Sequence, residues 1–149
     1  MSWQTLEDQD PDLAAFGVER LNGKVAYLAT TRKNGAPRVH PMTPIIGDGY
    51  LFVFMEPTSP KGHDLQRDSR YAIHCGVTDN SGASGEFYIS GRARLVDDPE
   101  LRALAARLSS YTPADRYVLF EFDVESATST VYTNDGTVRR TWKLADGSA

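Results

Sequence analysis

The sequence has only one cysteine, Cys75, and it contains no long apolar run. A single thiol excludes an internal disulfide and a metal site with several thiolate ligands, which fits a reducing compartment. No apolar run approaches the roughly 20 residues of a membrane helix. The first residues lack the basic and apolar segments of a signal peptide. We therefore expect a cytoplasmic protein that does not span or bind a membrane.

An excess of positive charge is also missing. Sixteen Lys and Arg residues stand against 20 Asp and Glu residues, a formal net charge of -4, which disfavours nucleic acid as a partner. The acidity is uneven, because residues 1–19 hold five acidic side chains and no Lys or Arg. Any anion-binding site must therefore come from a local cluster of basic residues in the nearly neutral remainder.

The length and composition predict one globular domain over residues 1–149. A chain of 149 residues with 40% hydrophobic and 24% charged residues can bury a sufficient core without disulfides or metals. Within it we expect an acidic, helical N-terminal segment over 1–23 and a frayed tail over 145–149.

Three helices are predicted from their end signals. Asp10-Pro11 begins a helix that Asn22-Gly23 ends, and Ser59-Pro60 begins a short helix that runs to about residue 68, with Ser59 as its N-cap. The third helix follows Asp98-Pro99, where leucines and alanine recur at helical spacing: Leu101, Leu104, Ala105 and Leu108.

The remaining pattern is that of β-strands. Strands are predicted over 24–31, 37–46, 50–55, 70–77, 86–95, 117–124, 128–133 and from 137 to about 144, and the 50–55 strand is apolar enough to be covered on both faces. Asn34-Gly35 predicts a type I′ hairpin turn. Three prolines in 37–46 require that this strand lies at an edge, bulges or leaves the sheet. Short turns between these strands favour a mainly β fold, an antiparallel barrel with short helices.

The start of the second predicted helix is a candidate anion site. Lys61 lies in a first turn, where the helix dipole disfavours a cation unless an anion binds there. The Ser59 hydroxyl would add a donor, Gly62 would permit close approach, and Arg38 could supply a bidentate contact. The alternatives are a solvated surface lysine and an ordinary exposed strand arginine.

A metal site is not predicted. The three histidines, His40, His63 and His74, share the central stretch with Cys75. However, His74 and Cys75 are adjacent on a strand and point to opposite faces, and no spacing matches a zinc motif. Cys75 is interpreted as a small buried hydrophobe. No catalytic acid, base or nucleophile can be assigned.

The aromatic residues divide into two groups. Seven are interpreted as core or interface residues: Tyr27, Phe52, Phe54, Phe87, Tyr88, Phe120 and Phe122. Trp142 lies among basic residues near the C-terminus, where it would stack on a planar ligand, cover a subunit joint or close the open end of the barrel.

Several segments together resemble the pyridoxamine 5′-phosphate oxidase-like family of flavoproteins, and the similarity runs from residue 24 to about 108. They are Ala29-Thr30-Thr31-Arg32-Lys33-Asn34-Gly35-Ala36-Pro37-Arg38-Val39-His40-Pro41, Gly47-Asp48-Gly49-Tyr50-Leu51, Ser59-Pro60-Lys61 with Leu65, Arg67-Asp68-Ser69-Arg70-Tyr71-Ala72, Gly91-Arg92-Ala93 and Asp97-Asp98-Pro99-Glu100. The resemblance implies an antiparallel split β-barrel of the FMN-binding type. It also implies a homodimer with a cofactor cleft at each end of the subunit interface, holding FMN or, alternatively, the deazaflavin F420.

The resemblance also implies roles for individual residues. Arg38, Ser59 and Lys61 would contact the cofactor phosphate, and Trp142 would reach the ring from the second subunit. The residues implied to line the isoalloxazine are Val39, His40, Pro41, Met42, Phe54 and Met55. Two departures from the family are visible. His63 stands where relatives often carry arginine, and the arginine motif that binds substrate in true pyridoxamine phosphate oxidases has no counterpart after Trp142.

The expected function is therefore a flavin- or deazaflavin-dependent oxidoreductase that moves a hydride between the ring and a small organic substrate other than pyridoxamine phosphate. In such an enzyme the redox chemistry resides in the cofactor. The alternative is a non-catalytic dimer that sequesters a flavin, a haem or another planar anion, because the binding residues would be identical.

Overall fold

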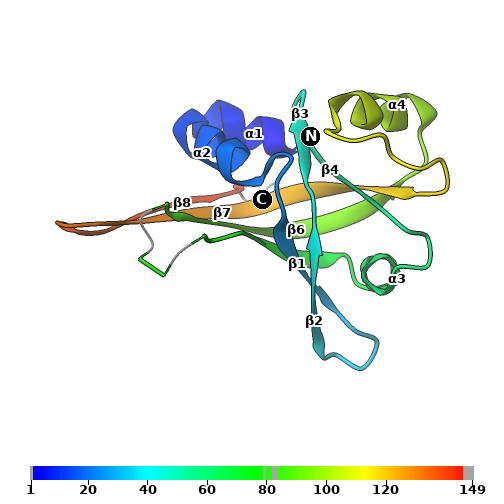
Figure 1. The fold of residues 1–149 in the computed structure, drawn as a ribbon, viewed down its shortest axis with the longest axis horizontal. Helices are drawn as coiled ribbons and strands as arrows, with labels where there is room; N and C mark the ends of the chain where they lie inside the picture. Colours follow the sequence, from blue (N-terminus) through cyan, green and yellow to red (C-terminus); the bar gives the residue numbers. More distant parts are fainter. Residues whose placement is uncertain (1, 79, 82–83, 146–149) are drawn as a thin grey trace.

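The computed structural model describes residues 2–78, 80–81 and 84–145 (Figure 1). Its helices are α1 (Ser2–Gln9), α2 (Pro11–Leu21), α3 (Pro60–Arg67) and α4 (Pro99–Leu108). Its strands are β1 (Ala26–Thr31), β2 (Pro37–Met42), β3 (Ile45–Gly47), β4 (Tyr50–Met55), β5 (Arg70–Cys75), β6 (Glu86–Val96), β7 (Val118–Thr133) and β8 (Gly136–Lys143). The three predicted helices are present, and α1 is an additional one within the acidic segment.

All eight strands form one antiparallel sheet with the order β2-β1-β5-β6-β7-β4-β3, and β8 pairs with β7. The first and last strands of this path, β2 and β3, are consecutive in the chain and separated only by Thr43 and Pro44. The sheet therefore curls until its two edges approach each other. This arrangement confirms the predicted fold class, a mainly β, antiparallel split barrel with short helices.

The prolines explain why the barrel is split. Pro37 and Pro41 lie on β2, which is an edge strand with β1 as its only partner, so their missing N–H groups cost no ladder hydrogen bond toward a second neighbour. Pro44 falls in the break between β2 and β3, where its carbonyl accepts a hydrogen bond from Gly23 N at 2.9 Å. The predicted 37–46 strand is therefore two strands at opposite edges of the sheet.

The predicted type I′ turn lies in another hairpin. Between β1 and β2 only Gly35 has a positive φ (88°), and Arg32 N bonds Ala36 O at 2.8 Å, so three residues form that loop. Between β3 and β4, Asp48 (φ 51°) and Gly49 (φ 84°) both adopt left-handed conformations, as a type I′ turn requires. Asn34 instead accepts a hydrogen bond from Ala36 N through its side chain, which stabilises the longer loop.

The prediction of separate strands over 117–124 and 128–133 was wrong, because one strand, β7, continues through both. The register against β6 shifts at Ser90 and Gly91, so Glu125 is an extra residue on β7. The bulge lets the long strand bend around the barrel and then project with β8 as a hairpin arm (Figure 1). Alternating burial along β6 breaks near its end, since Arg94 and Leu95 are both exposed and Val96 is buried.

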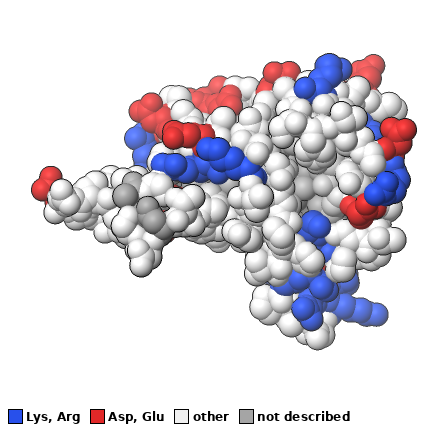
Figure 2. All heavy atoms as spheres, in the orientation of Figure 1, with Lys and Arg blue, Asp and Glu red and all other residues white. Residues whose placement is uncertain are grey.

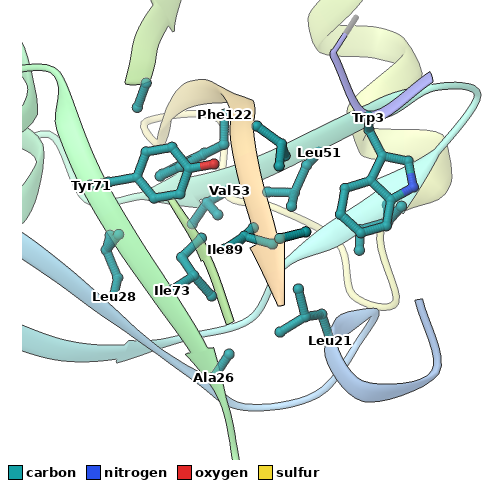
Figure 3. Packing of buried hydrophobic residues seen from close by; sticks show 14 of the residues in the cluster. Trp3, Leu21, Ala26, Leu28, Leu51, Val53, Tyr71, Ile73, Ile89 and Phe122 are labelled. Atoms are coloured by element: carbon teal, nitrogen blue, oxygen red, sulfur yellow. The ribbon is translucent and has the colours of Figure 1, made fainter. Parts of the chain in front are cut away.

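The core lies inside the curved sheet and beneath α1 and α2. Figure 3 shows side chains from β4, β5, β6 and β7 pointing toward one another, with Trp3 of α1 beside them. Gly17 of α2 is required here, because a Cβ at this position would lie 2.5 Å from the Phe87 ring. Burial of these apolar side chains is the main force that holds the two helices on the barrel.

Most of the aromatic residues that were interpreted as core or interface residues are buried within one chain. Phe52, Phe54, Phe87, Phe120 and Phe122 are buried, whereas Tyr27 and Tyr88 are exposed and so are not core residues. Cys75 is buried, as interpreted, and accepts a hydrogen bond from Phe87 N. Among the described residues, no helix is long and apolar enough to cross a membrane.

Candidate functional site

The start of α3 has an unusual arrangement of side chains. Ser59 occupies the predicted N-cap position and Pro60 the first helical position, but the Ser59 hydroxyl makes no capping bond to the helix backbone. It accepts a hydrogen bond from Lys61 Nζ at 3.0 Å instead. Because the hydroxyl oxygen is the acceptor in this contact, its own proton is available for another acceptor.

Lys61 is a half-buried cation without a carboxylate partner among the described residues. Burial lowers the pKa of its ammonium group, because the charged form loses hydration. The nearby carboxylate of Glu56 is engaged by Arg116, whose Nε donates to Oε2 at 2.9 Å. A bound anion would restore the interaction that Lys61 lacks.

Asp64, one turn further along α3, organises the neighbouring cations. Its side chain is 4% exposed and lies between two arginines. Arg38 Nε donates to Oδ2 at 2.7 Å, and Arg67 Nη2 donates to Oδ1 at 2.9 Å. Thr30 on β1 donates to Oδ2 at 2.8 Å. This buried carboxylate therefore fixes the guanidinium of Arg38 on β2 relative to the start of α3.

The electrostatics of Asp64 follow from these contacts. Burial alone would raise the pKa of its carboxyl, but the hydrogen bonds from Arg38, Thr30 and Arg67 outweigh that effect and hold the pKa below its ordinary value of 3.8. Only Nε of Arg38 is used in this contact, so its two Nη groups can still bind an anion in the bidentate manner.

A pocket of about 220 Å³ lies on one side of the α3 start, and we call it the β4 pocket. It is lined by Pro41, Met42, Thr43, Phe54, Met55, Glu56, Lys61, Tyr111 and Tyr117. The end of β2, the end of β4 and the α4–β7 loop supply its walls. Five of the predicted cofactor contacts thus meet in this pocket.

A larger pocket of about 620 Å³ lies on the other side of the α3 start, and we call it the basic pocket. It is lined by Arg32, Lys33, Asn34, Arg38, Pro60, His63, Asp64 and Arg67. Pro60 lines this pocket and Lys61 lines the β4 pocket, so the first turn of α3 separates the two. Figure 2 shows Lys and Arg side chains gathered over this region, around the β1–β2 hairpin.

The predicted site residues of β2 differ in burial and in whether they line the pockets. Arg38, His40 and Met42 are partly or fully buried, whereas the Val39 side chain is 64% exposed and lines neither pocket. His40 lines neither pocket, whereas Arg38 lines the basic pocket and Pro41 and Met42 line the β4 pocket. Burial, together with the positive charges of Lys61 and Arg38, lowers the pKa of His40 below 6.5, so its ring is mostly neutral at pH 7.

Gly62 packs closely against β4, and its role in permitting an anion to approach stays a prediction. A Cβ at Gly62 would lie 3.1 Å from Met55 Sδ and 3.6 Å from the Phe120 ring. The absent side chain therefore allows α3 to lie close against β4. His63 lines the basic pocket, and its Nε2 lies 3.0 Å from Pro57 O.

Trp142 lies apart from the other predicted contacts within one chain. Its side chain is 8% exposed in the core cluster, and its indole N–H donates to Gln9 Oε1 of α1 at 2.8 Å. This is the packing expected of a tryptophan that covers an end of its own barrel. Its contact with a cofactor held by a second copy stays a prediction.

Sequence reasoning missed Asp64, Arg67, Tyr111 and Tyr117. Asp64 carries a detectable signal, because Arg67 follows it at i+3 spacing, where opposite charges pair on a helix surface. The two tyrosines lie in the irregular α4–β7 loop, and only the tertiary structure places them. Within the described residues, no group of three His, Cys, Asp or Glu side chains is arranged to hold a metal.

Solved structures with the same fold share little sequence with this chain. A pyridoxamine 5′-phosphate oxidase-related, FMN-binding protein from Nostoc punctiforme has a TM-score of 0.71 at 14% identity, covering 98% of this chain and 95% of that one. A NimC/NimA family protein from Clostridium acetobutylicum has a TM-score of 0.68 at 18% identity, covering 95% and 96%. A heme binding protein from Mycobacterium smegmatis has a TM-score of 0.62 at 20% identity, covering 83% of this chain and 54% of that one.

Those similarities establish the fold. The search of curated proteins found no match. The family model for pyridoxamine 5′-phosphate oxidase matches residues 18–131, which include every strand from β1 to β6, the start of α3 and most of β7. The chain belongs to the pyridoxamine 5′-phosphate oxidase family.

Proposed function

We propose that this protein binds a flavin-type cofactor, FMN in the first instance, at the start of α3. The observation that carries the proposal is the half-buried Lys61 ammonium, which contacts the Ser59 hydroxyl but forms no ion pair with a carboxylate among the described residues. A phosphate is the anion that such a helix start favours, because backbone N–H groups, the helix dipole and a lysine converge there. The guanidinium of Arg38, fixed by Asp64, would add a bidentate contact.

The β4 pocket supports placement of the ring beside that phosphate. Met42, Phe54 and Tyr117 offer apolar and aromatic surface to a planar group, next to Lys61. The pocket of about 220 Å³ is smaller than the roughly 300 to 1,000 Å³ of complete ligand sites. We therefore include a second copy of the chain in the proposal, as the partner that completes the cleft.

The proposed activity is an oxidoreduction in which one hydride passes between the cofactor ring and a small organic substrate. The bound ring would supply the hydride chemistry. The residues of this chain would hold the phosphate through Lys61 and Arg38, orient the ring against Met42 and Phe54, and exclude water from it. A deazaflavin of the F420 type, which transfers hydride in the same way, is the alternative cofactor.

Replacing Lys61 by alanine should weaken FMN binding by about tenfold or more, which corresponds to the roughly 1.5–3 kcal/mol of a hydrogen bond to a charged group. Quenching of flavin fluorescence on titration measures this affinity. Lys143→Ala is a matched control, because it removes the same charge from exposed β8 and should leave the affinity unchanged. Equal FMN affinity in the wild type and Lys61→Ala would remove Lys61 from the site.

The distinction between an enzyme and a carrier needs a redox measurement. The protein with bound FMN is reduced anaerobically, and reoxidation of the flavin is followed by absorbance after addition of candidate acceptors. Reoxidation that depends on one acceptor, and is faster than that of free reduced FMN, supports the oxidoreductase. A bound cofactor that stays inert across a broad panel of acceptors would favour sequestration of the flavin instead.

The face proposed for dimer contact is the outer surface of β2, β1, β5 and β6. Cross-strand pairing aligns Pro41, Tyr27, His74 and Tyr88 in one row across these strands. Tyr27, Val39 and Tyr88 are 47%, 64% and 41% exposed. Exposed apolar and aromatic surface of this kind is typical of protein interfaces.

Introducing a charge into this face should separate the two copies. Tyr27→Asp is expected to halve the molar mass measured by light scattering, because an unpaired carboxylate would be buried at the joint. Val138→Asp on the exposed face of β8 is the control, since Val138 is 59% exposed on another part of the surface. A wild-type mass equal to that of one chain would contradict the proposed dimer.

A further inference from the structure

The basic pocket holds more positive charge than one phosphate requires. Among its lining residues, the side chains of Arg32, Lys33, Arg38 and Arg67 are cationic, and Asp64 is the one carboxylate. The balance is three positive charges, before any contribution from His63. A cluster of like charges is unfavourable by itself, so it points to an anionic ligand.

These cations differ in the hydrogen bonds and ion pairs that they already form within the protein. Arg67 Nη2 donates both to Asp64 and to Thr31 O, at 2.9 Å each, and Arg38 Nε is held by Asp64. Arg32 and Lys33 lie on the β1–β2 loop with exposed side chains, and no carboxylate among the described residues pairs with them. The two loop cations are therefore available to a ligand.

The position of Arg32 and Lys33 separates them from the proposed phosphate contacts. Lys61 lines the β4 pocket, whereas the two loop cations line the basic pocket. Arg38 and Pro60 also line the basic pocket, and Pro60 directly precedes Lys61 in the chain. A ligand that begins in the β4 pocket and passes Lys61 and Arg38 would thus continue toward Arg32 and Lys33.

The volume of the basic pocket supports a ligand that extends past Lys61 and Arg38 toward Arg32 and Lys33. Its volume of about 620 Å³ falls within the range of roughly 300 to 1,000 Å³ that accommodates whole drug-sized ligands. A single terminal phosphate would leave most of this space to water. The loop that carries Arg32 and Lys33 is held by the hydrogen bond from Arg32 N to Ala36 O at 2.8 Å and by the hydrogen bond from Ala36 N to the Asn34 side chain.

We propose that Arg32 and Lys33 form a second anion subsite, which binds a phosphate or carboxylate that the cofactor carries beyond its first phosphate. The inference rests on the proposed function and makes it more specific. FMN ends at its first phosphate. The proposed ligand is a flavin or deazaflavin with an anionic extension, and the shared chemistry of the extension is negative charge on oxygen, which matches guanidinium and ammonium donors.

The test compares three ligands on the wild type and on the double variant Arg32→Ala/Lys33→Ala. FMN has no extension, FAD extends through a second phosphate, and F420 extends through carboxylates. Fluorescence titrations at low salt should show at least one extended ligand binding about tenfold or more tighter than FMN, as expected from two partly exposed ionic contacts. The double variant should lose this advantage while its FMN affinity changes by less than about threefold. Tighter binding of FAD would show that the subsite binds the second phosphate. Tighter binding of F420 would show that it binds the carboxylates.

The control variant is Arg107→Ala on α4, which removes an exposed cation that lines neither pocket and should preserve every affinity. The advantage of the extended ligand should also shrink with added salt, because charge screening weakens exposed contacts. Equal affinity for FMN and both extended ligands, or an advantage that persists in the double variant, would overturn the second subsite while leaving FMN binding intact. Absence of binding by all three ligands would overturn the proposed function and this inference together.

Discussion

Replacing Asp64 by asparagine is expected to lower the free energy of unfolding by about 2 kcal/mol. The change keeps the size of the side chain but removes the charge that Arg38 and Arg67 contact at 2.7 and 2.9 Å. Two guanidinium groups would then face each other across a neutral amide, and one amide nitrogen would meet donors instead of acceptors. Urea-induced unfolding followed by fluorescence measures the loss.

The matched control is Asp68→Asn, one turn later on the chain. Asp68 also forms an ion pair, with Arg70 Nη2 at 2.6 Å, but that pair is exposed to solvent. Exposed pairs contribute little to stability, because water and salt screen them. Equal losses in the two variants would contradict the organising role assigned to buried Asp64.

The pH dependence of the Asp64 variant provides a second measurement of the same interaction. Because the ion pairs lower the pKa of Asp64 in the folded protein below 3.8, its contribution to stability is fully present above the unfolded pKa and is lost as pH falls through the folded pKa. The variant has no such group. The difference in unfolding free energy between wild type and Asp64→Asn should therefore be constant near neutral pH and shrink below about pH 4. A difference that stays constant down to pH 2 would show that the carboxylate charge is unimportant.

Replacing Gly91 by alanine is expected to cost about 3 kcal/mol or more of unfolding free energy. A Cβ at Gly91 would lie 2.0 Å from Asp123 O and 3.0 Å from Glu125 N, and these are backbone atoms of the neighbouring β7 strand. The strand cannot move away without losing the bulge that carries it around the barrel. The expected result is a large fall in the urea midpoint, or loss of the cooperative transition.

Gly76→Ala is the appropriate comparison for this substitution. Gly76 directly follows β5, and a Cβ there would meet its nearest neighbour, Val25 O, at 3.2 Å, so a small displacement relieves the contact. A much smaller loss of stability is expected. A Gly91→Ala protein with the midpoint of the wild type would show that the β6–β7 bulge adapts to a side chain.

Local structure was largely predictable from the sequence, because its signals are local. Asp10-Pro11, Ser59-Pro60 and Asp98-Pro99 each mark the start of a helix, and α2, α3 and α4 begin there. The prolines of residues 37–46 predicted a strand that lies at an edge, bulges or leaves the sheet, and β2 is an edge strand that ends before Pro44. The β1–β2 hairpin was predicted correctly, but its turn type was wrong. An Asn-Gly pair indicates a turn, whereas the length of the loop depends on the register of the two strands.

The errors in the strands have a common physical cause. No sequence signal marks Glu125 as a bulge within a continuous strand. The sequence therefore predicted two separate strands where the structure has β7. Its continuity depends on Gly91 of β6 accepting the displaced backbone. Such a contact joins residues more than 30 positions apart and leaves no periodic signal in either segment.

The sequence by itself determined the helix starts, the irregularity of the proline-rich strand over 37–46 and the choice of Lys61, Ser59 and Arg38 as candidate anion contacts. The tertiary structure alone decided that buried Asp64 fixes Arg38 against α3, that Gly62 packs on Met55, and that Trp142 is covered by its own N-terminal helix. The physical reason is that a helix cap or a proline acts on its immediate neighbours, where residue order is sufficient. An ion-pair cluster, a pocket or a close backbone approach depends on distances between strands, and only the folded sheet sets these distances.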